Sequence, residues 1–231
     1  MPASHGVGHR HVSGSSGRRD AHACGRGVGK SGRNVVKFGP VRDVPVLTTR
    51  RLFLRPWREA DRSAFAEMNG DPRVTKYFPS PLTPSESDAL MDRIVDDWRR
   101  GYGLWAVQRR DEGDFIGFLG FSQPRWQSHF TPCIEIGWRL VPTSWNQGFA
   151  TEGAFAAVSW GRANIEFPRN EIVSFTTTVN IPSRRVMEKL GMTHDEADDF
   201  DHPLLPDWDG RRHVLYRLAV SSRREESSDV L

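Results

Sequence analysis

The stretch Trp145-Asn146-Gln147-Gly148-Phe149-Ala150-Thr151-Glu152 decides the fold of this chain. It follows an apolar run at residues 133–141, which predicts a buried strand, and precedes an alanine-rich run at 153–163, which predicts a helix. The first N–H groups of a helix have no partner inside it, and the helix dipole is positive at that end. The stretch therefore predicts a binding site for a phosphate-bearing ligand, with an ordinary strand-to-helix turn as the alternative.

The first 45 of the 231 residues differ from the rest in composition. They contain nine of the 21 glycines, one aromatic residue and a net charge of +6, whereas the whole chain has a net charge of +3. A segment this polar cannot bury enough apolar surface to fold. We expect residues 1–45 to be a disordered basic extension rich in Gly, His and Arg, residues 46–220 to form one domain, and residues 221–231 to be a disordered tail.

The basic extension has two interpretations that concern function. It could bind nucleic acid through its cations, or it could be an idle extension, and its composition favours the second. We therefore expect no nucleic-acid partner. Residues 25–31 resemble a phosphate-binding P-loop, but the spacing requires a glycine where the chain has Cys24.

Cysteine content and hydropathy limit the location of the protein. Two cysteines, Cys24 and Cys133, are too few for a disulfide framework or a zinc site, so we expect no metal. No apolar stretch approaches the roughly 18 residues of a membrane span, and no apolar segment indicates a secretory signal. These features favour a cytoplasmic protein without a membrane partner.

Hydrophobic periodicity predicts a mixed α/β domain. The segment Thr83-Pro84-Ser85-Glu86 is a capping box that should begin a helix ending before Gly101. Other helices are expected at 59–69, 153–163 and 180–190. Strands are expected at 49–56, 104–109, 115–122, 133–141, 172–179 and 211–220, with 104–109 and 115–122 forming a hairpin.

Three motifs in this order resemble the GNAT superfamily of N-acetyltransferases, and within it the RimJ/RimL-like branch. They are Glu135-Ile136-Gly137-Trp138-Arg139-Leu140, the stretch 145–152, and Asn180-x-x-Ser183-x-x-Val186-Met187-Glu188-Lys189-Leu190-Gly191-Met192. The similarity covers most of residues 47–220. It implies a mostly antiparallel sheet, splayed between its fourth and fifth strands and flanked by helices. It also implies acetyl-CoA as cofactor and transfer of its acetyl group to a primary amine, by direct attack on the thioester.

Two groups of residues follow from this resemblance. Backbone N–H groups of Gln147, Gly148, Phe149, Ala150 and Thr151 should bind the diphosphate of coenzyme A. Backbone groups of Leu140 and Val141, where the strands splay, should bind the thioester end and stabilise the negative charge that develops on its oxygen.

Glu135 is the candidate general base, because it lies in an otherwise apolar strand at the expected site. An amine acceptor with a pKa of about 10.4 must lose a proton before it attacks. The alternative is a hydrogen-bonded glutamate in an ordinary strand.

The segment 180–187 carries the remaining catalytic candidates. Asn180 either binds the pantetheine arm or caps the next helix. Ser183 resembles the serine that donates a proton to the leaving thiolate in the RimL-like branch, or it hydrogen-bonds within the first helical turn. Met187 stands where many relatives have a tyrosine, and methionine cannot donate a proton. This departure leaves a non-catalytic acyl-CoA-binding or regulatory module as the alternative function.

The acceptor is not identified by the sequence. Trp126 and Phe130, in a loop expected at 124–132, are the candidates for substrate contact. The acidic segment 195–202 could attract a cationic acceptor or could be a solvated loop. A small-molecule amine and a peptide N-terminus both remain open, as does assembly into a homodimer.

Overall fold

The structure, a computed structural model, describes residues 44–220. The predictions for the extension at 1–45 and the tail at 221–231 therefore lie, apart from two residues, outside the described part. Those two belong to the fold. Val44 packs against the main core, and the Pro45 carbonyl accepts a hydrogen bond from Trp105 Nε1 at 2.8 Å. Within 44–220, no helix combines the length and the hydropathy needed to cross a membrane.

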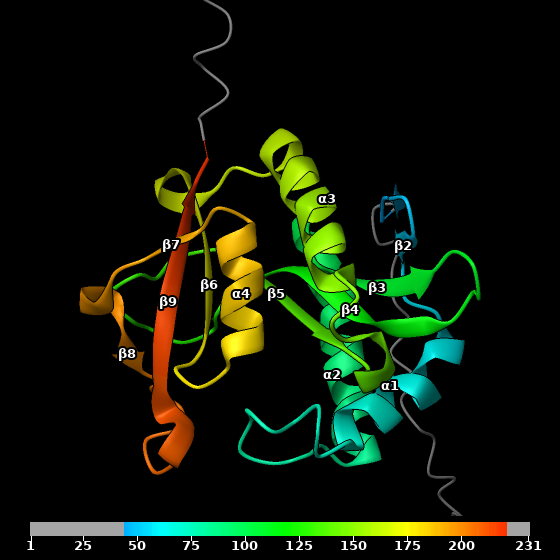
Figure 1. The fold of residues 1–231 in the computed structure, drawn as a ribbon, viewed down its shortest axis with the longest axis horizontal. Helices are drawn as coiled ribbons and strands as arrows, with labels where there is room; N and C mark the ends of the chain where they lie inside the picture. Colours follow the sequence, from blue (N-terminus) through cyan, green and yellow to red (C-terminus); the bar gives the residue numbers. More distant parts are fainter. Residues whose placement is uncertain (1–43, 221–231) are drawn as a thin grey trace, which may run out of the picture. The chain divides into compact units, whose positions relative to one another are not determined.

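One nine-stranded sheet forms the centre of the described part (Figure 1). Its strands are ordered β1-β2-β3-β4-β5-β6-β9-β7, and β8 pairs with β9. All neighbouring strands are antiparallel except β5 and β6. The bounds are β1 Leu47–Thr48, β2 Leu52–Arg55, β3 Leu104–Arg109, β4 Phe115–Ser122, β5 Glu135–Leu140, β6 Glu171–Thr177, β7 Thr193–His194, β8 Phe200–Asp201 and β9 Arg212–Ala219. The predicted fold class is confirmed.

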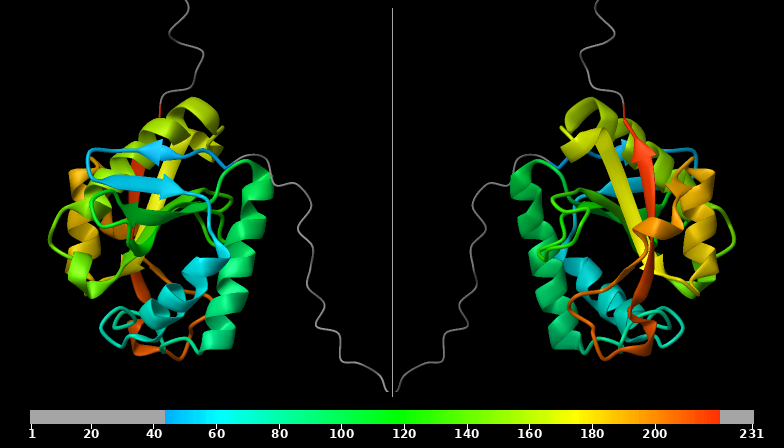
Figure 2. Two further views of the ribbon diagram at one scale, coloured as in Figure 1. Left: turned by 90° about the vertical axis from the view of Figure 1, so that its right-hand side faces the viewer. Right: turned by 90° about the vertical axis from the view of Figure 1, so that its left-hand side faces the viewer.

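Four α-helices flank this sheet on two sides (Figure 2). Their bounds are α1 Arg62–Gly70, α2 Pro84–Asp97, α3 Phe149–Asn164 and α4 Ile181–Lys189. Helices α3 and α4 cover one face and contribute to the main core, together with Leu119, Ile136 and Ile172. Helices α1 and α2 lie on the other side, where Phe65 and Ile94 pack against Phe118 of β4.

Alternation along the strands places different side chains on the two faces of β5 and β6. Ile136 and Leu140 of β5, with Ile172 of β6, point into the main core. The residues between them point to the opposite side. We call this side the Glu135 face, which carries Glu135, Gly137 and Arg139 of β5, and Val173, Phe175 and Thr177 of β6.

Strands β5 and β6 are paired only where they begin. Glu135 lies opposite Val173, and the Val173 N–H donates to the Ile134 carbonyl at 3.1 Å. No later residue of β5 pairs with β6, although β5 stays paired with β4 as far as Leu140. The parallel strands therefore part toward their carboxyl ends, which confirms the predicted splay between the fourth and fifth of the expected strands.

Some boundaries differ from those that the sequence predicts. The strand expected at 49–56 is observed only as β2, Leu52–Arg55, because residues 49–51 form the turn from β1, in which the Thr49 hydroxyl accepts from the Leu52 N–H. Helix α3 begins at Phe149, directly after Gly148, and not at residue 153. The two-residue strands β7 and β8 are too short to leave a periodic signal.

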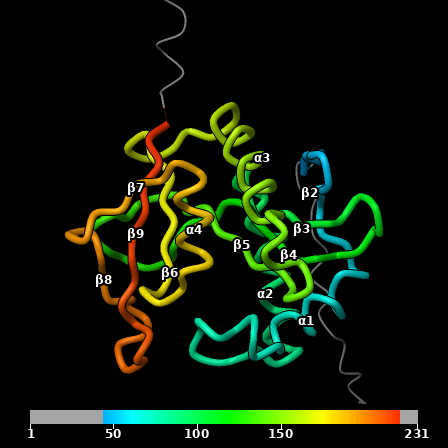
Figure 3. The backbone as a smooth tube through the Cα atoms, in the orientation of Figure 1, coloured from blue at the N-terminus to red at the C-terminus, as the bar shows by residue number. Residues whose placement is uncertain are grey.

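The capping box before α2 is confirmed and also ends the loop 71–83 that connects α1 to α2 (Figure 3). The Thr83 hydroxyl accepts from the Glu86 N–H at 3.3 Å, and Glu86 Oε2 accepts from the Thr83 N–H at 2.8 Å.

We expect Thr83→Ala to lower the free energy of unfolding by about 1 kcal/mol, because the first turn of α2 loses its cap. Urea unfolding followed by circular dichroism measures the change. Ser159→Ala, an exposed position on α3 without a side-chain hydrogen bond in the described structure, is the control. Equal stability of wild type and Thr83→Ala would show that the box does not hold this helix end.

Candidate active site

The turn before α3 presents unpaired backbone donors. Gly148 is the N-cap residue, with a φ of 79°, and no side chain caps the helix. Its carbonyl accepts the first helical hydrogen bond, from the Glu152 N–H at 2.9 Å. The N–H groups of residues 147–151 make no hydrogen bond within the described part of the chain. A left-handed residue followed by free helical N–H groups is an arrangement that binds anions.

The same turn is fixed to the β1–β2 connection through Glu152. Its carboxylate accepts from Thr49 Oγ1 at 2.7 Å and from the Arg51 N–H at 2.8 Å, and it pairs with Arg51 Nε at 2.6 Å. The Arg51 guanidinium lies 4.4 Å from the centre of the Phe149 ring, and its Nη2 is 3.5 Å from the point where a Cβ on Gly148 would lie. A cation therefore lies beside the free N–H groups.

Two side chains of the turn bind the turn itself. Gln147 Nε2 donates to the Thr143 carbonyl at 2.7 Å, so one of its two side-chain N–H groups is used within the turn. Trp145 Nε1 donates to the Leu140 carbonyl at 2.7 Å, which links the turn to the end of β5.

Leu140 and Val141 differ in the direction of their backbone groups. The Val141 N–H donates to the Ile116 carbonyl at 2.9 Å, and its carbonyl accepts from the Ser144 N–H at 3.0 Å. Both backbone groups of Val141 are thus engaged within the chain, and a contact of Val141 with the cofactor stays a prediction. Because N–H directions alternate along a strand, the Leu140 N–H points toward the separated β6.

Glu135 lies where the two strands are still paired. Its Oε2 accepts from Ser122 Oγ at 3.3 Å, from the adjacent strand β4. Burial raises the pKa of the Glu135 carboxyl to about 8, against an opposing contribution from the Ser122 hydrogen bond. The residue keeps some exposure to solvent, so its proton can exchange. A carboxyl group with this pKa suits proton transfer near neutral pH.

Asn180 and Ser183 begin α4, beyond the carboxyl end of β6. The Asn180 side chain accepts from the Ser183 N–H at 3.4 Å and donates to Thr176 Oγ1 at 2.8 Å. Asn180 is therefore the helix cap, and its contact with pantetheine stays a prediction. The Ser183 hydroxyl is half-buried and makes no hydrogen bond within residues 44–220. Met187 lies in the main core.

The two aromatic residues proposed to contact substrate differ in exposure. Phe130 is fully buried and packs against Phe200, with ring centres 4.8 Å apart. Trp126 covers this cluster and is half-buried, with its ring 5.6 Å from that of Phe175 on the Glu135 face. Of the two, Trp126 has the surface that a ligand can reach.

Carboxylates of the acidic segment contact basic side chains of the same chain. Asp198 binds Arg217 Nε at 2.7 Å, and Asp199 lies 2.7 Å from His194 Nε2. These pairs favour a structural role over attraction of a cationic acceptor. Between residues 44 and 220, no three His, Cys, Asp or Glu side chains gather in a way that could hold a metal ion.

Sequence reasoning missed two polar residues of the Glu135 face, Arg139 and Thr177. Each has one buried polar atom without a hydrogen-bond partner in the described structure. Arg139 could have been identified from the sequence, because it is a charged residue in an otherwise apolar strand, four residues after Glu135. The run Thr176-Thr177-Thr178 gave no such indication for Thr177, because any of the three could have faced the site.

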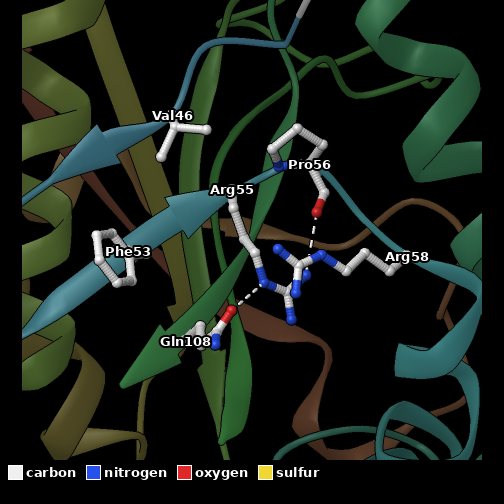
Figure 4. A pocket seen from close by; sticks show the side chains of 6 residues that line it. All are labelled: Val46, Phe53, Arg55, Pro56, Arg58 and Gln108. Carbon is white, nitrogen blue, oxygen red and sulfur yellow. Dashed lines mark hydrogen bonds between the residues drawn. The ribbon is translucent and has the colours of Figure 1, made fainter. Parts of the chain in front are cut away.

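A surface pocket elsewhere in the fold is lined by Val46, Phe53, Arg55, Pro56, Arg58 and Gln108 (Figure 4). The Arg55 guanidinium donates to both carboxylate oxygens of Asp61 at 2.8 Å, and it also binds Gln108 and the Pro56 carbonyl. These partners satisfy its polar groups, and none of the lining residues belongs to the site around β5 and α3.

Comparison with known proteins agrees with this geometry. Residues 51–193 match the family model described as the acetyltransferase (GNAT) domain. The chain is 31% identical over 150 residues to YnaD, an uncharacterised N-acetyltransferase of Bacillus subtilis, with 64% of this chain and 83% of YnaD covered. It is 32% identical over 171 residues to the FsC-acetyl coenzyme A-N(2)-transacetylase of Aspergillus fumigatus, with 69% and 70% covered.

The structural comparison gives the same answer. A GNAT-family acetyltransferase from Bacillus anthracis superimposes with a TM-score of 0.62 at 25% identity, covering 76% of this chain and 98% of that one. The chain belongs to the GNAT acetyltransferase family, whose members use acetyl-CoA, and it is an N-acetyltransferase. The non-catalytic alternative is therefore not retained.

The raised pKa of Glu135 predicts a pH-dependent difference in stability between wild type and Glu135→Gln. In wild type, the contribution of protonated Glu135 to the free energy of unfolding is fully present below pH 4.5, the usual pKa of a glutamate. This contribution is lost as the pH rises through about 8. The variant should gain stability relative to wild type across this window, by at most about 1.4 kcal/mol per pH unit. Urea unfolding between pH 4 and 9 measures it.

The exposed Glu166→Gln is the matched control and should track wild type at every pH. A Glu135→Gln difference that stays constant from pH 4 to 9 would contradict the raised pKa.

Proposed function

We propose that this chain transfers the acetyl group of acetyl-CoA to a primary amine by direct attack of the amine on the thioester, as in the RimJ/RimL-like branch that its motifs resemble. The acceptor class is a small-molecule amine or a peptide N-terminus. The observation that supports the proposal most is the set of unpaired N–H groups at residues 147–151, directly beside the splayed strands.

The residues present fit coenzyme A. The N–H groups of Gln147, Gly148, Phe149, Ala150 and Thr151 bind its diphosphate, and the helix dipole of α3 adds to their attraction. Arg51 supplies a positive charge at the same turn. The backbone groups that β5 and β6 leave unpaired would hold the pantetheine arm, with Asn180 and Leu140 at the border of that gap. When bound, the cofactor supplies an acetyl group activated as a thioester.

Glu135 acts as the general base. It accepts the proton of the attacking amine, directly or through one water, as the new N–C bond forms and the C–S bond breaks. The raised pKa of Glu135 is closer to the pKa of an amine than the pKa of an ordinary carboxyl group is. This smaller difference favours the proton transfer. The proton then leaves to solvent, because Glu135 is only partly buried by its surroundings.

The Leu140 N–H and the Ser183 hydroxyl supply the remaining interactions. The Leu140 N–H donates to the thioester oxygen as negative charge develops there, which is typically worth about 2.7–4 kcal/mol. Ser183 would donate its hydroxyl proton to the departing thiolate and would regain a proton from solvent. Its hydroxyl has no partner in the described structure, and it stands in the first turn of α4, whose dipole favours a nearby anion.

The role of the phosphate turn is tested by Gly148→Ala with Gly191→Ala as its matched control. Both glycines have a φ of 79°, so alanine introduces similar backbone strain at each position. Only the Cβ at 148 stands beside Arg51 and the free N–H groups, whereas a Cβ at 191 meets no atom within 4 Å.

Gly148→Ala should raise the KM for acetyl-CoA by about tenfold, the effect of losing one charge-assisted hydrogen bond. Gly191→Ala should leave the KM unchanged. Isothermal titration with coenzyme A gives the same comparison without turnover, and equal weakening in both variants would exclude the turn as the binding site.

The general base is tested by the pH dependence of kcat/KM for an amine acceptor. In wild type we expect a limb with an apparent pKa near 8, rising with pH. Glu135→Gln should lose that limb and lower kcat/KM by about 10²–10⁴-fold. A variant with the wild-type rate and pH profile would remove Glu135 from the mechanism.

A further inference from the structure

Arg139 is a half-buried cation without a carboxylate partner in the described part of the chain. Its Nη1 donates to Asn69 Oδ1 at 2.6 Å, and its guanidinium lies 4.2 Å from the centre of the Phe78 ring and 5.4 Å from that of Phe118. Its Nε is buried and has no hydrogen-bond partner, and no Asp or Glu of residues 44–220 forms an ion pair with it. A charge that is partly withdrawn from water is normally paired, and the buried Nε–H of this guanidinium has no acceptor in the described structure.

Thr177 provides a second unsatisfied group. The residue is 2% exposed, and its Oγ1 makes no hydrogen bond. Arg139 Nε and Thr177 Oγ1 are the two buried side-chain polar atoms left without partners in the described part of the chain. Buried polar atoms are seldom left unpaired without a reason such as a missing ligand.

The sheet register places these two groups at equivalent positions on the two strands, one on each side of the splay. Glu135 lies opposite Val173 at the start of the parallel pair, so counting four residues along each strand takes the first to Arg139 and the second to Thr177. Even-numbered steps keep side chains on the same face. Both unsatisfied atoms therefore belong to the Glu135 face, one on each side of the splay, and both can donate a hydrogen bond.

The space between Glu135 and Arg139 is open above the strand. Gly137 lies between them on the same face, and a Cβ placed there meets only Glu135 Oε1, at 3.7 Å, within 4 Å. The Cα atoms of Glu135 and Arg139 are about 13 Å apart at the usual rise of a strand. Among residues 44–220, no other residue therefore fills the position directly above Gly137, between the two side chains.

The chemistry at the Arg139 end selects an anion. A guanidinium N–H and a hydroxyl are both donors, and a carboxylate can accept from both at once. Burial also lowers the pKa of Arg139 to about 10, the direction expected for a cation held without a counter-ion. A neutral amide or hydroxyl on the ligand would accept a hydrogen bond but would leave the charge unpaired.

We propose that the acceptor of this acetyltransferase is an amine that also carries a carboxylate, with the amine at Glu135 and the carboxylate bound by Arg139 and Thr177. This inference rests on the proposed function. Arg139 is then a specificity-determining residue, which distinguishes acceptors by their anionic end. Asn69 and Phe78 hold its guanidinium in place from α1 and the loop 71–83.

The test measures kcat/KM for matched acceptors: ω-amino acids and dipeptides of increasing length, each beside its carboxamide. Wild type should prefer the acid of the best length over its amide by about 100-fold, as expected for a buried charge pair. Arg139→Gln should bring that preference close to one, mainly through the KM of the acid. Thr177→Val, which keeps the shape of the side chain, should reduce the preference by about tenfold.

Arg125→Gln is the control, because it removes an exposed arginine of the loop 124–132 and should keep the wild-type preference. Calorimetry measures binding of the same acids and amides to the coenzyme A complex without turnover. The acid-to-amide ratio of affinities is independent of the fraction of a variant that is folded. Coenzyme A titration of each variant shows whether the cofactor site is intact.

The outcomes separate this inference from the proposed function. Acetylation of neutral amines with an acid-to-amide ratio near one in wild type would overturn the carboxylate site and leave the acetyltransferase mechanism standing. A wild-type preference that persists in both Arg139→Gln and Thr177→Val would show that Arg139 only packs against Phe78. Failure to bind coenzyme A at all would instead contradict the proposed function.

Discussion

The separation of β5 from β6 is the constraint on which the site depends. The two strands share one parallel pairing, Glu135 with Val173, and then follow different partners. Strand β5 stays with β4 through the Val141 N–H, and β6 stays with β9 as far as the pairing of Thr177 with His213. Because each strand is held on its outer edge, the gap between them is built into the sheet and does not require a ligand to open it.

The gap joins two differently built sides of the molecule. On the side of α3 and α4, the free N–H groups after Gly148 and the cation of Arg51 suit a phosphorylated cofactor. On the Glu135 face, a carboxyl group with a raised pKa and an unpaired arginine suit an acceptor with opposite charges at its two ends. Direct transfer requires the acetyl group and the acceptor amine to meet, and the splay is the place where the two sides border each other.

The sequence was sufficient for features that depend on local patterns. The hairpin at 104–122, the capping box at Thr83 and the glycine turn before α3 each rest on neighbouring residues, and the structure has all three. It was insufficient where the answer depends on pairing between distant strands. The engagement of Val141 with β4, and the alignment of Arg139 with Thr177, follow from sheet register, which a single sequence does not display.

The central claim is that the backbone N–H groups of residues 147–151 hold the diphosphate of coenzyme A. Amide resonances of these residues, followed by NMR during titration with coenzyme A, test it most directly. The account predicts large downfield shifts at Gly148, Phe149, Ala150 and Thr151, with saturation at one equivalent, because new hydrogen bonds to an anion form there. Resonances at these positions that stay in place while coenzyme A binds would contradict it.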